Sequence, residues 1–372
     1  MRLLVADDQP DVLEALRLLL APQNFKFTSV TTPSALLDQV RAGEWDAVLM
    51  DLNYQRGTTS GDEGLELLTQ IRDERPGLPI VVMTAWGDID LAVRAMHAGA
   101  KSFVEKPWDN RKLVQILERE IAAGKGAREQ SELHGREQRD ALLIQRALMP
   151  GSLPSTPRFE LAGAWQPAGT LGGDCYDVFT FGPDAIGVSI ADVAGKGLPA
   201  ALLMSSMQAA VKAFAHDAPS PQALCASVNR LLCGQMIAGR FVTMVYLRLD
   251  AGRGTLAYAN AGHNPPFLAR ANGQVEMLPS SGTVLGVFAD ADYQGAQLPI
   301  GSGDRLVLYT DGITEVRDTG DQEFGEERLK ESLVRHRHLG AAALHAAMMK
   351  EITGFASAGF QDDATLLVVA IP

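Results

Sequence analysis

Four short motifs rich in aspartate and glycine lie in residues 150–372. They are GGDCYD (172–177), ADVAGKG (191–197), TDGITE (310–315) and QDDAT (361–365). Acidic sites without histidine or cysteine ligands favour the hard cations Mg²⁺ or Mn²⁺ over zinc. Two such cations held about 3.5–4 Å apart can share a water, lower its pKa and drive its in-line attack on a phosphate ester. The motifs therefore predict metal-dependent hydrolysis of phosphate esters.

The second motif follows a row of apolar residues. Asp192 shares one face of a predicted strand with Ile186, Val188 and Ile190. A lone buried carboxylate is costly, and a metal or a cationic partner would remove that cost. The glycines beside the aspartates let the backbone approach closely and free carbonyls for ligation. The sequence does not favour a nucleophilic side chain. No cysteine has an arginine six residues later, as a thiol phosphatase loop requires, and no G-x-S-x-G elbow for a serine nucleophile occurs.

A second chemical group lies in residues 1–121. Its members follow or end predicted strands and are Asp7, Asp8, Asp51, Thr84 and Lys106. Three carboxylates brought together repel one another, and a hard cation such as Mg²⁺ relieves this through oxygen ligation. The lysine and the hydroxyl beside them suit a phosphoryl group. A cis bond between Lys106 and Pro107 would aim the lysine.

The elements that must position this group alternate between strand and helix. Apolar runs predict strands at 3–6, 26–30, 47–50, 80–83 and 102–104. Apolar residues recur at helical spacing in 12–20 and in 65–71. This alternation predicts an α/β doubly wound fold, a parallel sheet with helices on both faces. In such sheets the working residues lie just beyond the carboxyl ends of the strands.

Residues 150–372 have a different pattern. Strands are predicted at 186–190, 241–249, 255–259, 305–309 and 365–371, and helices at 199–214, 221–232 and 341–353. Several of these strands follow one another without an intervening helix. This order favours antiparallel sheets with helices packed outside, an α+β arrangement.

Length and composition bound the remaining possibilities. The 372 residues suggest a domain at 1–121, a connector at 122–149 and a domain at 150–372. The net charge of −12, with no basic patch, argues against binding to nucleic acid. The three cysteines form no CxxC pair, the chain starts without a signal peptide, and no apolar run reaches membrane-spanning length. These features predict a cytoplasmic protein without membrane contact.

Residues 1–121 resemble a response-regulator receiver domain of two-component systems. The resemblance implies that Asp51 is the phosphoacceptor, that Asp7 and Asp8 help hold Mg²⁺, and that the phosphoryl group is contacted by Thr84 and Lys106. Phe103 falls at the aromatic switch position. A sensor histidine kinase is the implied partner. The long loop NYQRGTTSGDEG that follows the phosphoacceptor departs from the pattern and would reshape access to the site.

From about residue 145 to the end, the chain resembles the PPM (protein phosphatase 2C-like) family, in its bacterial sporulation-phosphatase branch. The four acidic motifs carry the resemblance, together with NAGHNPPFL (260–268) and EFGEERL (323–329). The implied fold is a β-sandwich flanked by helices, and the implied activity is dephosphorylation of Ser or Thr on proteins. The implied ligands of two Mn²⁺ or Mg²⁺ ions are Asp174, Asp192, the Val193 carbonyl, Asp311 and Asp362. The implied substrate is a phosphorylated anti-sigma antagonist.

Some residues near these motifs keep two interpretations. Asp177 either hydrogen-bonds its loop or binds metal, and His263 either makes a structural hydrogen bond or transfers a proton. Lys196 either attracts the substrate phosphate or is an exposed turn lysine, and Asp363 is an adjacent ligand candidate.

The connector, residues 122–149, also has two interpretations. Its helical pattern is broken by Gly124, Gly126 and Gly135, and only Leu133 interrupts the polar run before the apolar stretch at 142–148. A stable coiled coil is therefore weakly supported. The segment is either a signalling helix that pairs in a homodimer and passes the receiver state onward, or a flexible tether.

Taken together, the sequence predicts a response regulator whose phosphatase activity is switched by phosphorylation of Asp51. The aspartyl phosphate would reorient Thr84 and Phe103 and bias a two-state surface. The alternative is a catalytically weak adaptor of the same fold that sequesters a regulatory partner. All four acidic motifs are present, which argues against the adaptor.

Overall fold

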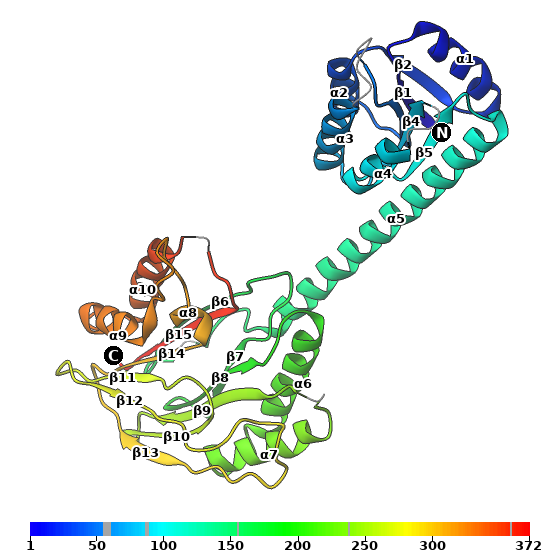
Figure 1. The fold of residues 1–372 in the computed structure, drawn as a ribbon. Helices are drawn as coiled ribbons and strands as arrows, with labels where there is room; N and C mark the ends of the chain where they lie inside the picture. Colours follow the sequence, from blue (N-terminus) through cyan, green and yellow to red (C-terminus); the bar gives the residue numbers. More distant parts are fainter. Residues whose placement is uncertain (55–60, 86–88, 155, 237–238, 358) are drawn as a thin grey trace. The chain divides into compact units, whose positions relative to one another are not determined.

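The computed structural model describes residues 1–54, 61–85, 89–154, 156–236, 239–357 and 359–372. The chain divides into two compact units, Met1–Arg136 and Glu137–Pro372 (Figure 1). The domain limits expected from the sequence, at residues 121 and 149, stay predictions. The long loop predicted after the phosphoacceptor includes residues 55–60 and so lies partly outside the described residues.

A parallel sheet forms the centre of the first unit. Its strands are β1 (Arg2–Ala6), β2 (Lys26–Val30), β3 (Ala47–Asp51), β4 (Ile80–Ala85) and β5 (Ser102–Lys106), in the order β2-β1-β3-β4-β5. The central strands are short apolar runs, and β3 is buried along its whole length, as expected where helices cover both faces of a sheet. All five predicted strands and the doubly wound α/β fold are confirmed.

Helices cover both faces of this sheet. They are α1 (Pro10–Leu20), a 3₁₀ turn at Ala21–Gln23, α2 (Pro33–Ala42), α3 (Asp62–Glu74), α4 (Ile89–Ala98) and α5 (Asn110–Leu148). α1 and the start of α5 pack on the face that carries Leu3, and α2, α3 and α4 pack on the face that carries Leu4. Of these helices, the sequence pattern predicts α1, α3 and, with breaks, α5. It misses α2 because that helix buries just Leu36 and Val40.

α5 is a single helix of 39 residues. The prediction that three glycines break this helix is wrong. Gly124 lies against Pro79, since a Cβ atom on it would sit 2.5 Å from Cγ of Pro79, and the next residue, Lys125, pairs with Asp46 at 3.4 Å. The close approach accounts for Gly124 in a helix, where a glycine costs roughly 1 kcal/mol. Neither α5 nor another helix in the described ranges is long and apolar enough to cross a membrane.

Two antiparallel five-stranded sheets form the centre of the second unit. Their orders are β13-β10-β9-β8-β7 and β12-β11-β14-β15-β6. The strands are β6 (Glu160–Gln166), β7 (Cys175–Thr180), β8 (Ala185–Val193), β9 (Val242–Asp250), β10 (Thr255–Ala261), β11 (Phe267–Ala269), β12 (Val275–Met277), β13 (Ala296–Pro299), β14 (Arg305–Tyr309) and β15 (Ala364–Ala370). The five strands predicted in this part are confirmed as β8, β9, β10, β14 and β15, and so is the antiparallel α+β arrangement.

The two sheets pack face to face as a sandwich. Apolar side chains of β8 and β9, such as Val188 and Leu247, share one buried cluster with Leu308 and Leu367 of β14 and β15. α6 (Leu198–Phe214) and α7 (Pro221–Cys233) pack on the first sheet, and α9 (Gly325–His336) and α10 (Ala341–Phe355) pack on the second (Figure 1). The short helix α8 (Asp311–Thr314) follows β14. The predicted helices are confirmed as α6, α7 and α10, whereas the largely charged α9 is missed.

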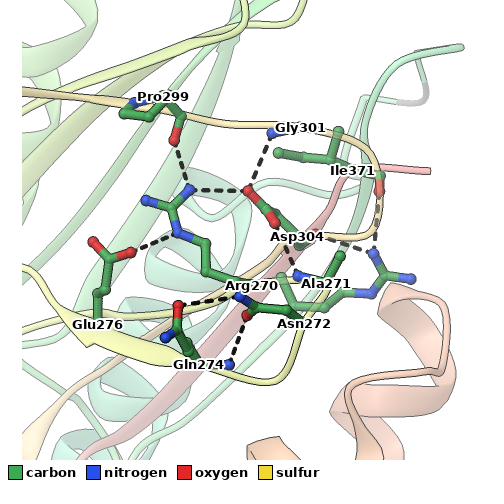
Figure 2. A network of polar contacts seen from close by, with 10 residues as sticks. Arg270, Ala271, Asn272, Gln274, Glu276, Pro299, Gly301, Asp304 and Ile371 are labelled. Carbon is green, nitrogen blue, oxygen red and sulfur yellow. Dashed lines mark hydrogen bonds and ion pairs between the residues drawn. The ribbon is translucent and has the colours of Figure 1, made fainter.

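A buried ion pair stabilises the turns next to the second sheet (Figure 2). Arg270 contacts Asp304 at 3.1 Å, and only 16% and 8% of the two side chains are exposed. Figure 2 shows the other partners of the pair, which are Glu276, the Pro299 carbonyl and the backbone amides of Ala271 and Gly301. Because nearly every polar atom of the pair has a partner, the network can hold the turns at 270–276 and 299–304 in place.

Candidate functional site

The acidic group of the first unit gathers at the carboxyl ends of the parallel strands. Asp7 follows β1, Asp51 ends β3 and Lys106 ends β5. The Nζ atom of Lys106 lies 2.7 Å from Asp7 Oδ2 and 2.8 Å from Asp51 Oδ2. Carboxylate oxygens of Asp7, Asp8 and Asp51 all lie within 4.8 Å of one another, a spacing that one oxygen-ligated cation can bridge.

Burial governs the electrostatics of this group. Asp7 is fully buried and Asp51 is 5% exposed. Burial raises the pKa of Asp51, opposed by the charge and hydrogen bond of the Lys106 ammonium. Burial lowers the pKa of Lys106, but the charges and hydrogen bonds of Asp51 and Asp7 raise it overall. A cation beside these carboxylates would favour their ionised form.

The remaining expected residues of the first unit lie on β4 and β5. Thr84 is buried in β4, and Phe103 of β5 is 39% exposed. The peptide bond between Lys106 and Pro107 is cis, as expected. In the described part of the chain no hydrogen bond joins the Thr84 hydroxyl to Asp51, so the expected contact of Thr84 with a phosphoryl group stays a prediction.

The four acidic motifs of the second unit meet where the two sheets adjoin. Asp174 precedes β7 and Asp192 lies near the end of β8, both in the first sheet. Asp311 directly follows β14 and Asp362 precedes β15, both in the second sheet. The charge of Asp192 interacts with those of Asp311 and Asp362. The sandwich thus brings together four acids that are up to 188 residues apart in the chain (174 to 362).

Asp174 is the most enclosed of the four, with 1% of its surface exposed. Its Oδ2 atom accepts hydrogen bonds from the hydroxyls of Thr310 and Thr365, each at 2.7 Å. Its Oδ1 atom is buried and receives no hydrogen bond from the described residues. Burial, followed by the charge of Asp192, raises the pKa of Asp174 well above its usual range, and the two hydroxyls oppose that shift.

Two more of these acids have raised pKa values. Burial, followed by repulsion from Asp311, raises the pKa of Asp192 to about 7. Burial, followed by repulsion from Asp362, raises the pKa of Asp311. Within the described ranges these acids form no trio as tight as that of the first unit. Acids that repel one another in pairs are suited to more than one bridging cation.

The residues present fit divalent cations. The donor set consists of carboxylates and a nearby carbonyl, and such hard oxygen ligands suit Mg²⁺ and Mn²⁺. The Val193 carbonyl lies beside the loop of Asp174, since a Cβ atom on Gly173 would sit 2.8 Å from it. The unpaired Oδ1 of Asp174 is the clearest sign of a missing positive partner.

Lys196 lies at the exposed rim of this acidic cluster. Its Nζ atom is 2.9 Å from Asp362 Oδ2 and donates to the Gln361 carbonyl at 2.9 Å. The side chain is 62% exposed. The lysine charge therefore faces both the acids and the solvent from which a substrate would arrive.

Asp363 organises the loop before Asp174. Its Oδ1 atom accepts the Ala168 amide at 2.9 Å, and its Oδ2 atom accepts the Gly173 amide at 2.5 Å. A Cβ atom on Gly172 would lie 2.7 Å from the same Oδ2. Because both oxygens are occupied by backbone amides, the geometry favours a loop-holding role for Asp363 over metal ligation.

Asp177 contacts helix α6. Its Oδ2 atom lies 3.1 Å from Nζ of Lys212 and 3.4 Å from Nε2 of Gln208. Both of these side chains also donate to the carbonyl of Leu148, at the end of α5. These contacts favour the hydrogen-bonding interpretation of Asp177 and place it in a link between α5, α6 and β7.

His263 is buried behind one of the acids. Its Nδ1 atom lies 2.8 Å from the Thr243 hydroxyl, and Thr243 pairs with Asp192 across β8 and β9. The Asn260 side chain hydrogen-bonds both the amide and the carbonyl of His263. Burial lowers the pKa of His263 to about 4. A neutral, enclosed imidazole favours the structural interpretation over proton transfer.

Three residues with contacts at this site are not predicted from the sequence, namely Gln145, Thr310 and Thr365. Gln145 is buried and exchanges two hydrogen bonds with the backbone of Gly172, at 2.6 and 3.1 Å. A signal for the threonines is present, since Thr310 directly precedes Asp311 and Thr365 ends the QDDAT motif. Gln145 offers a weaker signal, as a polar residue inside an apolar helical stretch.

The fold and the acidic site define a receiver domain followed by a PPM-type phosphatase domain. The chain belongs to the family described as Stage II sporulation protein E (SpoIIE), whose model matches residues 182–372. The model of the response regulator receiver domain matches residues 3–118. Both resemblances drawn from the sequence are confirmed.

Two relatives extend over most of this chain but only part of their own length. IcfG of Synechocystis sp. is 28% identical over 254 residues, which cover 61% of this chain and 40% of IcfG. The phosphoserine phosphatase RsbU of Bacillus subtilis is 29% identical over 227 residues, which cover 61% of this chain and 67% of RsbU.

Among solved structures, the SiaA-PP2C domain of Pseudomonas aeruginosa has the fold of the second unit. Its TM-score is 0.59 at 22% identity, over 65% of this chain and 98% of that domain. At this identity the likeness concerns the fold alone. The expected β-sandwich flanked by helices is confirmed.

Proposed function

We propose that the chain is a metal-dependent protein serine/threonine phosphatase whose activity is switched by phosphorylation of Asp51. The observation that carries the proposal is the meeting of four acids, Asp174, Asp192, Asp311 and Asp362, in one partly buried cluster. Burial and mutual repulsion raise the pKa of three of them. The name of RsbU, a phosphoserine phosphatase, supports the substrate class.

In this proposal, two Mn²⁺ or Mg²⁺ ions are held by Asp174, Asp192, the Val193 carbonyl, Asp311 and Asp362. The ions would supply a water of lowered pKa for in-line attack on the phosphate ester, so that no nucleophilic side chain is required. Lys196 draws the substrate phosphate toward the cluster from its exposed rim. Asp363 keeps the loop before Asp174 in place through its two backbone contacts.

The first unit provides the switch. Asp7, Asp8 and Asp51 hold Mg²⁺, and a sensor histidine kinase supplies the phosphoryl group. Phosphorylation of Asp51 forms an oxygen–phosphorus bond on its carboxylate as the bond to the phosphoryl donor breaks. The new group lies beside the Lys106 ammonium, now 2.8 Å from Asp51 Oδ2, and biases Thr84 and Phe103 toward a second arrangement. Such coupling is typically worth about 1–3 kcal/mol, enough for a several-fold to hundredfold change in output.

α5 offers a physical route for the signal. Gln145, near its end, binds the backbone of Gly172, two residues before Asp174. The Leu148 carbonyl is bound by two α6 side chains that also contact Asp177, three residues after Asp174. The helix end is thus attached on both sides of a candidate ligand, which supports the signalling-helix interpretation over the flexible tether.

Two further features belong to this proposal. Leu143 and Ile144 of α5 are each 65% exposed, and exposed apolar neighbours on a charged helix favour pairing with a second copy of the chain. The sporulation-phosphatase resemblance supports a phosphorylated anti-sigma antagonist as the substrate.

The proposal is tested by phosphatase assays on the full chain with an aryl phosphate and a phosphoserine protein, with and without Mn²⁺. Each assay is run with and without beryllofluoride, a mimic of the phosphorylated aspartate, on wild type and on Asp51→Asn. We expect Mn²⁺-dependent turnover that changes with beryllofluoride in the wild type only. Asp192→Ala and Asp311→Ala should eliminate turnover while leaving the fold intact.

Other outcomes are informative. Turnover that does not change with beryllofluoride would support the phosphatase activity and contradict its regulation by phosphorylation of Asp51. Absence of turnover from folded protein with several metals would overturn the phosphatase and favour the adaptor that sequesters a partner.

A further inference from the structure

We infer that Thr310 and Thr365 form a hydroxyl clamp that positions Asp174, so that this residue offers a single oxygen, Oδ1, to the metal site. The inference rests on the proposed function, because it takes Asp174 as a metal ligand. Neither threonine would touch the reacting atoms. Both act through Asp174 as positioning residues.

The clamp occupies one oxygen completely. Thr310 and Thr365 are both fully buried, and both hydroxyls lie 2.7 Å from Asp174 Oδ2. The Thr310 hydroxyl also accepts the amide of Thr365 at 3.0 Å. It has one hydrogen and two possible acceptors, and Asp174 Oδ2 at 2.7 Å is nearer than the Asp363 carbonyl at 3.3 Å, which favours the bond to Asp174. Two short hydrogen bonds to an ionised acceptor belong to the strong class. They leave Oδ2 without room for a metal.

The other oxygen is left for the cation. Oδ1 is buried, and no donor among the described residues reaches it. A buried carboxylate oxygen without a donor is costly. A second acid, Asp192, lies close enough for its charge to act on Asp174. A cation bound at Oδ1 would satisfy this oxygen and reduce the repulsion between the two acids, so Asp174 would offer Oδ1 alone to the metal site.

The clamp also ties this ligand to the other acidic motifs. Thr310 lies between β14 and Asp311, and Thr365 is the second residue of β15, just after Asp362 and Asp363. The same two segments therefore carry the clamp and two candidate ligands. Asp174 comes from the loop before β7, in the opposite sheet. The distance between ligands from the two sheets is set in part by these hydroxyls.

The test compares valine, which removes the hydroxyl at nearly constant shape, with serine, which keeps it. Full-length Thr310→Val, Thr365→Val, Thr310→Ser and Thr365→Ser are prepared with Asp8→Asn, which weakens the candidate cation site of the first unit. Mn²⁺ affinity is measured by calorimetry and by the electron paramagnetic resonance signal of free Mn²⁺. The thermal midpoint of the metal-free protein is recorded for each variant.

We expect each valine to weaken Mn²⁺ binding about 10–100-fold, the range typical for loss of a group that orients a metal ligand. The serine variants should bind Mn²⁺ as the parent does. Valine variants that bind Mn²⁺ as tightly as the parent would overturn the clamp. So would serine variants that lose as much affinity as valine, since packing rather than the hydroxyl would then be responsible.

Asp174→Asn distinguishes a failure of the threonine clamp from a failure of the proposed metal site. If this variant abolishes binding of one ion while the valine variants leave it unchanged, the clamp fails and the metal site stands. If Asp174→Asn itself leaves Mn²⁺ binding unchanged, the proposed metal site fails and the clamp fails with it.

Discussion

Two of the most enclosed ionisable side chains of the second unit respond to burial in opposite directions. Asp174 and His263 are 1% and 3% exposed. Burial disfavours the charged form of each, so it raises the pKa of the acid and lowers the pKa of the imidazole to about 4. The histidine is therefore neutral at physiological pH, whereas the acid requires either a proton or a cation. This difference separates a structural residue from a candidate ligand.

The histidine makes a pH-dependent contribution to stability. Its folded-state pKa of about 4 lies below its ordinary value of 6.5, so the unfolded chain binds more protons between these values. The contribution of neutral His263 to the free energy of unfolding is fully present above pH 6.5. It is lost as pH falls toward 4, which lowers the free energy of unfolding by about 3 kcal/mol. In urea titrations of metal-free protein at several pH values, His263→Gln should show a shallower loss than the wild type.

The matched control is His134→Gln, because His134 is an exposed histidine on α5. It should keep the wild-type pH dependence. An equal loss of stability on acidification in wild type and His263→Gln would contradict the assignment.

The acids could be predicted at the residue scale, but their supporting residues could not. Each of the four candidate ligands stands in a glycine-rich or acidic motif that by itself indicates metal ligation; they are Asp174, Asp192, Asp311 and Asp362. Thr310 and Thr365 stand inside two of these motifs, but the sequence does not indicate which residue their hydroxyls bind. Thr310 and Thr365 bond an aspartate that is 136 and 191 residues away in the chain, and only the sandwich brings them together.

At the scale of elements, prediction succeeded where a segment is long, apolar and buried. β8 and β9 each have nine residues and bury most of them, and both are predicted. β11, β12 and β13 have three or four residues, too few to show a period. For α5 the prediction errs the other way, because its three glycines suggest breaks, whereas the helix is continuous over 39 residues.

The turns of the second sheet depend on the Arg270–Asp304 network of Figure 2. Asp304→Ala would leave Arg270 without its buried partner and two backbone amides without an acceptor. We expect a loss of about 3–5 kcal/mol in the free energy of unfolding, as when one partner of a buried pair is removed. Urea denaturation monitored by circular dichroism measures the loss.

Arg253→Ala is the comparison for this network. Arg253 is 84% exposed and pairs with Asp250 at 3.5 Å, so its removal should cost under about 1 kcal/mol. A similar small cost for Asp304→Ala would show that the network contributes little.

At the scale of the whole molecule, the proposed switch requires the first unit to act on the second. Gln145 belongs to α5 but contacts the loop of a candidate ligand. Gln145→Ala removes both hydrogen bonds with Gly172. We expect its phosphatase activity to lose its dependence on beryllofluoride, whatever the basal rate, because the helix end no longer holds that loop. The measurement is the ratio of rates with and without beryllofluoride.

Gln130→Ala serves as the control, because Gln130 is exposed on the same helix. Its response to beryllofluoride should equal that of the wild type. If Gln145→Ala also keeps the full response, the signal does not pass through this contact.

The continuity of α5 has a consequence for building chimeras. An α-helix turns about 100° per residue, so an insertion of seven residues returns the helix nearly to its starting phase, whereas an insertion of two turns it to the far side. Gln145 projects from one face of that helix, and from this face its side chain bonds the backbone of Gly172. A foreign sensor grafted before residue 137 should therefore govern the phosphatase domain when its own helix arrives in phase. The rotational phase of the helix at the junction should therefore decide whether a chimera is regulated, more than the identity of the sensor does.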